Sequence, residues 1–251
     1  MKIIISPAKK MEECSDLFEP GGLPEFLLEA ETLLSRLKAM TEPELKVLFK
    51  ANDSITHENF LRFRSMELSG AQTPAVLSYV GIQYQYMAPK LFSYGQWEYV
   101  KEHLRILSGF YGILKPDDRV VPYRLEMQAK LPAGASGDLY GFWGRRLYEA
   151  LIRDDRAPVI VNLASKEYSR SVEPYLEPGV RFVTCVFGVK SGGKVKVKAT
   201  EAKMARGEMV RFMAEHGIEK EEELKGFSCL GYRFSEMESS GDTYVFLKET
   251  T

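Results

Sequence analysis

The sequence lacks the features that would place a protein in a membrane or in an oxidising compartment. Its three cysteines, Cys14, Cys185 and Cys229, lie far apart without a CxxC pair, which excludes a disulfide scaffold and indicates a reducing compartment. No apolar run approaches the roughly 18 residues of a membrane span, and the isoleucines of MKIIISPAKK are too few for a signal peptide. The sequence therefore predicts a cytoplasmic protein that does not enter a membrane.

Histidine and net charge are also scarce. The three histidines stand alone, without a second histidine or a cysteine at the spacing of a metal site, so we expect neither a metal nor a cofactor. The net charge of −1 gives no overall field that would attract nucleic acid or anionic lipid. Any such binding would need a local cluster of cations.

What is present predicts an α/β fold. Residues 2–5 and 158–163 are short β-branched runs typical of buried parallel strands. We expect one helix to begin near Pro24 and a second to begin at a capping box formed by Thr41 and Glu44. Apolar residues at helical spacing predict a third helix over 97–107, with Gly109 as its C-terminal cap. Two more helices are expected, one capped by Asp138 and one over 200–216. We predict a single mixed α/β domain over residues 1–251, with a central sheet and flanking helices.

Three further segments have strand character. Residues 75–87 are rich in valine, isoleucine and tyrosine, which favours a strand with Gly81 at a bulge or close approach; a helix is the alternative. Hairpins are expected around SGG, joining 180–189 to 194–198, and around SSGD within 232–248.

Polar residues follow both predicted buried strands. Ser6 and Lys9 follow the first, and Asn162, Ser165 and Lys166 end the second. Because the carboxyl ends of parallel strands share one edge of a sheet, where such proteins bind ligands, these five residues form a candidate site. Taken singly, each is more simply explained as a helix cap or a turn residue.

A basic segment offers a second set of candidates. Residues 190–211 hold seven lysines and arginines against two glutamates. Lys203 and Arg206 lie one turn apart on a predicted helix, where they could bind phosphate, and Gly207 implies close packing beside Arg206. The KVKVK run is better explained as an edge strand protected by lysines.

Residues 107–127 combine a glycine-rich turn with a charged pair. Gly109 and Gly112 flank an apolar pair and could form a tight hairpin whose N–H groups hold a phosphate, as in a loose helix-hairpin-helix-like element. Alternation over 122–127 predicts a strand with Arg124 and Glu126 on one face. The pair is either a structural salt bridge or an anion receptor with Glu126 as a catalytic acid or base.

These motifs together resemble the bacterial YaaA family of peroxide stress resistance proteins. The matching stretches are ISPAK at 5–9, LSGFYGILKP at 107–116, PYRLEM at 122–127, LYGFWG at 139–144, VNLAS at 161–165 with Glu167 and Tyr168, Lys203 with ARG at 205–207, and Gly231-Tyr232 through Ser239-Ser240.

The resemblance implies a mixed α/β protein that limits oxidative damage and intracellular iron under hydrogen peroxide. It also implies a positively charged cleft and a hairpin linked to duplex DNA, and no established reaction. Carried onto this sequence, the hairpin falls on Leu107–Lys115 and the cleft on Lys9, Arg124, Lys166, Lys203 and Arg206.

Two hypotheses follow. In the first, the protein binds double-stranded DNA without sequence specificity through these cations. In the second, it is an enzyme or binding protein for a phosphorylated or nucleotide-like small molecule, because a carboxylate such as Glu126 would repel DNA. A partner-binding protein without either ligand ranks last, because the polar motifs lie at strand ends and not on apolar patches.

Overall fold

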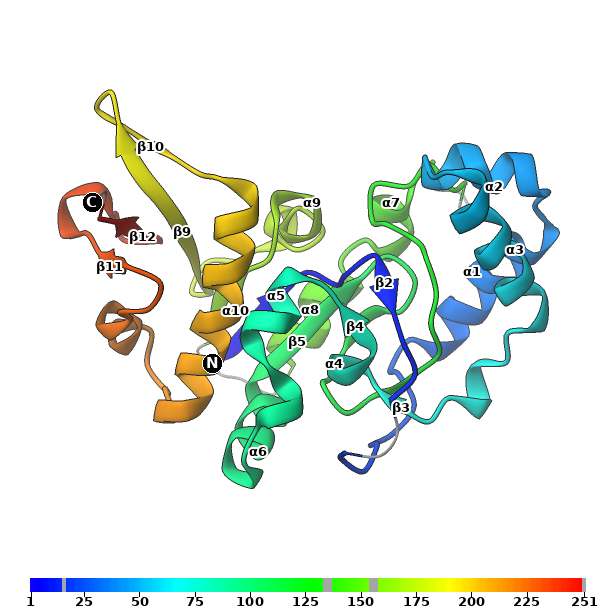
Figure 1. Ribbon diagram of the computed structural model, residues 1–251, viewed down its shortest axis with the longest axis horizontal. Coiled ribbons are helices and arrows are strands. Elements are labelled where there is room, and N and C mark those ends of the chain that lie inside the picture. Colours follow the sequence, from blue (N-terminus) through cyan, green and yellow to red (C-terminus); the bar gives the residue numbers. More distant parts are fainter. Residues whose placement is uncertain (15–16, 133–136, 154–157, 250–251) are drawn as a thin grey trace.

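The computed structural model describes residues 1–14, 17–132, 137–153 and 158–249. Its centre is an eight-stranded sheet flanked by helices, so the α/β fold is confirmed (Figure 1). The strands of this sheet are β1 (Lys2–Ile5), β5 (Leu104–Ser108), β6 (Gly112–Leu114), β8 (Val159–Leu163), β9 (Arg181–Ser191), β10 (Lys194–Lys196), β11 (Tyr232–Phe234) and β12 (Thr243–Lys248). Two small sheets pair β2 (Lys10–Met11) with β4 (Tyr79–Val80) and β3 (Thr73–Pro74) with β7 (Arg119–Val120).

The order of the parallel strands determines where a ligand site can form. Five strands run parallel in the order β5, β1, β8, β9, β12, which in chain order is second, first, third, fourth, fifth. Strands β6, β10 and β11 join antiparallel. Strand β5, the next parallel strand in the chain, lies on one side of β1, and β8 lies on the other side. The carboxyl ends of β1 and β8 therefore flank a topological switch point, where doubly wound sheets open a crevice for ligands.

Helices cover the sheet and extend beyond one end of it. Figure 1 shows α1, α2 and α3 grouped at one end of the molecule, away from β9 and β12. The α-helices are α1 (Leu27–Ala39), α2 (Glu42–Phe49), α3 (Asp53–Ser65), α4 (Ala75–Ser78), α5 (Ile82–Met87), α6 (Tyr94–His103), α7 (Leu139–Trp143), α8 (Arg146–Ile152), α9 (Lys166–Ser169) and α10 (Ala199–His216). Short 3₁₀ helices span Leu68–Gly70, Pro89–Leu91, Glu173–Tyr175, Glu221–Gly226 and Glu236–Glu238. None of the helices in the described parts of the chain has both the length and the apolar character to cross a membrane.

Most local signals in the sequence are confirmed. The two β-branched runs are β1 and β8, and both are buried at the centre of the sheet. The capping box joins Thr41 to Glu44 at the start of α2, and Asp138 accepts a hydrogen bond from Gly141 N at the start of α7. Both predicted hairpins form, and Gly217 ends α10 in the left-handed conformation.

Three local predictions are wrong, and in the first two a distant partner overrides the local pattern. Residues 75–87 form α4, the two-residue β4 and α5, since the helices pack on neighbours that the pattern does not reveal. The helix predicted over 97–107 ends at His103, because Leu104–Ser108 pairs with β1 as strand β5. Residues 122–126 have no regular secondary structure and belong to no strand of the described chain. Their alternation survives, with Arg124 and Glu126 half-buried between buried neighbours.

The glycine-rich turn is a buried β-hairpin and not a helix-hairpin-helix-like element. Strand β5 turns through Gly109, Phe110 and Tyr111 into β6, and both aromatic side chains are fully buried. The amide groups of Phe110 and Tyr111 donate to Ser108 Oγ at 3.1 and 2.9 Å. Because these N–H groups are already paired inside the protein, they do not present a phosphate site.

Candidate functional site

A pocket of about 400 Å³ lies at the switch point of the sheet. Ser6 directly follows β1 and Ser165 closely follows β8, and both line it. The Ser165 amide donates to Ser6 Oγ at 2.8 Å, and the Ser6 hydroxyl donates to Ser165 Oγ at 3.2 Å. These bonds join the two strand ends, so the loops of β1 and β8 form one wall of the pocket.

Segments from across the chain supply the other walls. The sequence-predicted residues that line this pocket are Ser6, Lys9, Arg124, Glu126, Ser165, Lys203 and Arg206. With Lys10 included, five cationic side chains and the carboxylates of Glu126 and Glu167 line it. The fold thus places around one pocket several cationic residues that are far apart in the sequence.

Arg206 reaches the pocket because α10 packs unusually close to α5. A Cβ built at Gly207 would overlap the Gln83 carbonyl oxygen and lie 2.9 Å from Met87 N, so only glycine allows this approach. The predicted close packing beside Arg206 is confirmed, and its partner is the backbone of α5. Burial lowers the pKa of the Arg206 guanidinium.

A second close approach positions Arg124 and Glu126. A Cβ at Gly109 would lie 2.7 Å from the Leu125 carbonyl oxygen and 2.9 Å from Glu126 C, so the glycine lets this segment cross the hairpin. Arg124 Nη2 then donates to Glu126 Oε1 at 3.3 Å, and Lys9 Nζ lies 2.8 Å from the same oxygen. Gly109 thus supports the site without lining it.

The pocket contains hydrogen-bond donors without acceptors. Among the described residues, four side chains carry a buried nitrogen with no partner, and three of these line the pocket: Gln83 Nε2, Arg124 Nε and Arg206 Nε. Lys203 and Arg206 form no ion pair within the described chain. Buried unpaired donors are costly, so three of them around one pocket make it a candidate site for a ligand that carries acceptors.

The two carboxylates of the pocket differ in environment. Glu126 is held by Lys9 and Arg124, whereas Glu167 Oε1 accepts from the Gln128 amide at 3.2 Å and Glu167 forms no ion pair among the described residues. Burial, together with the nearby charge of Glu126, raises the pKa of Glu167. A carboxyl group that holds its proton more readily, next to a second carboxyl group paired with two cations, is an arrangement that can support acid and base roles.

A group of tyrosines forms the floor of the pocket. The Tyr84 hydroxyl donates to the Ser6 carbonyl at 3.0 Å, which fixes the loop after β1. The Tyr123 hydroxyl lies 2.8 Å from the Tyr79 hydroxyl and 2.6 Å from Ser108 Oγ. Burial raises the pKa of Tyr123 to about 12, so these hydroxyls are neutral and hold the floor by hydrogen bonds.

The other predicted residues lie outside the pocket. Asn162 is buried and accepts from the Ala164 amide at 3.0 Å, so it shapes the turn after β8. Lys166 is exposed and pairs with Glu173 at 2.7 Å. Lys115 lies against Asp118, which accepts from its amide. Gly112 has a positive φ of 75° and packs against Trp143, a structural position.

Three pocket residues carried only weak signals in the sequence. Glu167 follows Lys166 shortly after the end of β8, within a matching motif, so its position in the sequence could have identified it as a candidate site residue. Gln83 and Tyr84 lie in the segment predicted as a strand, and their place on α5 became visible only with the fold. Across the part of the chain that the structure describes, no group of three or more His, Cys, Asp or Glu side chains is placed to hold a metal ion.

Comparisons with known proteins agree on one relationship. A family model described as peroxide stress protein YaaA matches residues 1–238. A UPF0246 protein of Lachnoclostridium phytofermentans is 52% identical over 248 residues, covering 99% of this chain and 96% of that protein. UPF0246 proteins of Desulfitobacterium hafniense and Pediococcus pentosaceus are 50% and 49% identical over 248 residues, each covering 99% of this chain and 98% of the relative.

Proposed function

The chain belongs to the family of peroxide stress protein YaaA, and from this premise we propose that it acts in peroxide defence by binding a small phosphorylated or nucleotide-like molecule. The binding site is the pocket at the carboxyl ends of β1 and β8. Limitation of oxidative damage and of intracellular iron, which the family resemblance implies, would be the outcome of this binding.

The observation that carries the proposal is the set of unpaired donors. Arg124, Arg206 and Gln83 each keep a buried nitrogen without an acceptor and line the same pocket. A phosphate bound among these donors would supply several acceptor oxygens. The planar guanidinium groups of Arg124 and Arg206 suit the geometry of a phosphate. Cations that lack an acid partner, as Lys203 and Arg206 do in the described chain, favour an external anion over an internal one.

The remaining pocket residues have separable roles. The hydroxyls of Ser6 and Ser165 orient the bound group beside the end of β1. Lys9 and Lys203 are exposed and contribute charge at the entrance. If the bound molecule is transformed, Glu126 and Glu167 are the groups that would transfer a proton, with Glu167 as the acid because its pKa is raised.

The size and charge of the pocket favour a small molecule over a duplex. About 400 Å³ lies within the usual range of small-molecule sites. Two carboxylates among the cations would repel a duplex backbone, whereas a small ligand can be placed to avoid or use them. The hairpin amides that could have held DNA phosphates are paired with Ser108.

Duplex DNA is the second candidate, and one observation favours it. Exposed Lys50 and Lys130 line a neighbouring cavity, which shares Lys9 with the first pocket. Cations spread over both cavities could contact several phosphates along a backbone. In that case log affinity for a duplex would fall with log salt, at a slope near −0.9 for each phosphate neutralised.

Native mass spectrometry of the purified protein, with metabolite analysis of released ligands, tests the proposal. We expect a co-purifying phosphorylated compound, and we expect Lys203→Ala and Arg206→Ala each to lower its occupancy about tenfold or more. Arg211→Ala is the matched control, because Arg211 lies on the same helix, pairs with Glu215 and does not line the pocket.

Glu126→Gln separates a chemical role from a binding role. We expect the variant to keep the ligand, since the amide retains an acceptor for Lys9 and Arg124. If no phosphorylated compound binds the wild-type protein, and a duplex binds with a steep salt slope that Lys203→Ala and Arg206→Ala flatten, the second candidate replaces the first.

A further inference from the structure

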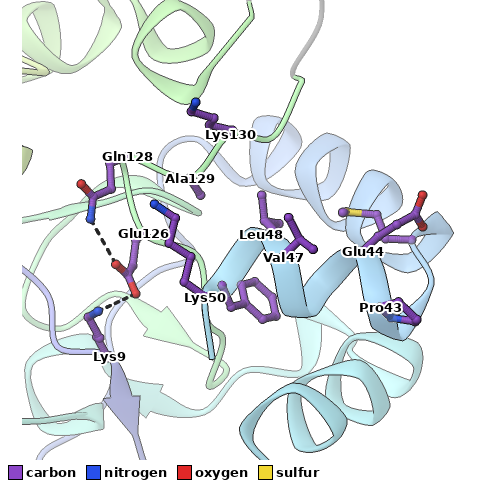
Figure 2. Close-up of a pocket in the computed structure, with 12 residues that line it drawn as sticks. Lys9, Pro43, Glu44, Val47, Leu48, Lys50, Glu126, Gln128, Ala129 and Lys130 are labelled. Carbon is purple, nitrogen blue, oxygen red and sulfur yellow. Dashed lines mark hydrogen bonds and ion pairs between the residues drawn. The ribbon is translucent and has the colours of Figure 1, made fainter. Parts of the chain in front are cut away.

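A second cavity, of about 660 Å³, adjoins the first pocket and differs from it in chemistry. It lies between the end of α1, α2 and the segment 126–130 (Figure 2). Met40, Pro43, Val47, Leu48, Phe49 and Ala129 contribute its apolar lining. Charged and polar groups are placed around these side chains, as in sites that bind an apolar body and fix it by a few polar contacts.

The two cavities share a boundary. Lys9 and Glu126 line both, and their ion pair is seen at one side of the second cavity in Figure 2. The Lys9 side chain is 65% exposed, so its pairing with Glu126 is weak and Lys9 can contact a ligand anion instead. A molecule bound in the first pocket can therefore extend past this pair into the second cavity.

Helix α2 directs apolar groups into the cavity and not only into the core. Its buried face, Leu45 and Phe49, packs inside the protein. Val47, on another face, lines the cavity and is 77% exposed, which leaves its methyl groups available to a ligand. The side chain of Lys50, at the end of the same helix, extends toward Glu126 in Figure 2.

We propose that the second cavity binds the apolar body of the molecule whose phosphate is bound in the first pocket. The inference rests on the proposed function and narrows it. The ligand class is a phosphate ester of an apolar or aromatic group about the size of a nucleoside, and not inorganic phosphate or a small sugar phosphate. The phosphate gives most of the orientation, and burial of the apolar body gives additional affinity.

Binding of 1-naphthyl phosphate tests this directly, since its fluorescence reports transfer of the ring to an apolar site. We expect it to bind at least tenfold more tightly than inorganic phosphate and to be displaced by inorganic phosphate. Val47→Asn should weaken naphthyl phosphate about five- to tenfold and leave the affinity for inorganic phosphate unchanged. Val47 is exposed, so this variant should fold.

Leu28→Asn is the matched control. Leu28 is 75% exposed on the neighbouring helix α1 and does not line the cavity, so its loss should change neither affinity. Equal affinities of naphthyl phosphate and inorganic phosphate, or equal effects of Val47→Asn and Leu28→Asn, would overturn the second site while leaving the phosphate pocket in place. Failure of inorganic phosphate to bind at all, with Arg206→Ala indistinguishable from wild type, would instead overturn the proposed function.

Discussion

At the scale of single residues, the protein buries several ionisable groups, and they serve different ends. Arg124 and Arg206 are half-buried at the pocket, and each has one buried nitrogen without an acceptor, which is the basis of the ligand binding proposed for them. Cys185 is buried in β9, and burial raises the pKa of its thiol to about 12, so it stays protonated near neutral pH. Asp118 is buried away from the site, and its effect is expected on stability.

The pH dependence of stability should reveal Asp118. Burial raises the pKa of Asp118 to about 7, and the nearby charge of Asp117 acts in the same direction. The hydrogen bond from the Lys115 amide and the charges of Lys115 and Arg105 lower the pKa and partly offset this rise. Between pH 4 and 7 the folded state holds a proton that the unfolded chain, with a pKa of about 3.9, has released. The free energy of unfolding therefore falls as pH rises through this window and is constant above it.

Asp118→Asn should remove this dependence, because the amide stays neutral and can still accept from Lys115 N. At pH 8 we expect the variant to be more stable than wild type by about 1–3 kcal/mol, with the difference vanishing toward pH 4. Urea denaturation at a series of pH values measures it. A difference between the two proteins that does not change with pH would contradict the assignment.

At the scale of elements, two glycines determine how the site is assembled. Gly207 brings α10 against the backbone of α5, and Gly109 brings the segment 124–126 across the β5–β6 hairpin. Gly207 is next to Arg206 in the sequence, whereas Gly109 is distant in the sequence from Arg124 and Glu126 and meets their segment only in the fold. The spacing between elements, more than the exposure of any side chain, therefore decides where Arg206 and Arg124 lie.

Gly207→Ala tests this spacing. The added methyl overlaps the Gln83 carbonyl oxygen, so we expect a loss of about 1–3 kcal/mol in the free energy of unfolding, although alanine favours a helix. Displacement of α10 should also weaken phosphate binding through Arg206. Gly95→Ala in α6 is the control, since nothing lies within 4 Å of its added Cβ; its stability should stay equal or rise by at most about 1 kcal/mol. Equal melting temperatures for the two variants would show that the close approach is unimportant.

The sequence predicts elements well where the signal is local and poorly where a partner is distant. Caps at Thr41 and Asp138 are made within one helical turn, so they were visible. Strand β5 was mistaken for the end of a helix because its stability comes from pairing with β1, about a hundred residues earlier. The composition of α5 favours a strand, but its backbone packs closely against α10, a contact that no local pattern contains.

At the scale of the whole molecule, the site follows from strand order. Placement of β1 between β5 and β8 opens the sheet edge at Ser6 and Ser165, and the loops and helices around it bring the cations inward. The sequence predicted that these residues would meet, because strand-end motifs and a resemblance both pointed to them. The sequence did not distinguish Lys9 from Lys166. Lys9 lines the pocket, whereas the Lys166 side chain, at the start of α9, pairs with Glu173, and this difference depends on side-chain direction. The single-domain organisation stays a prediction.

The most direct test of the account is an NMR titration of the full-length protein with inorganic phosphate, observing the arginine Nε–H signals. The account predicts that two of these signals shift on binding, that they are lost in Arg124→Lys and Arg206→Lys respectively, and that the Arg211 signal does not move. Phosphate-induced shifts spread over the exposed lysines, with all arginine Nε–H signals unchanged, would contradict it.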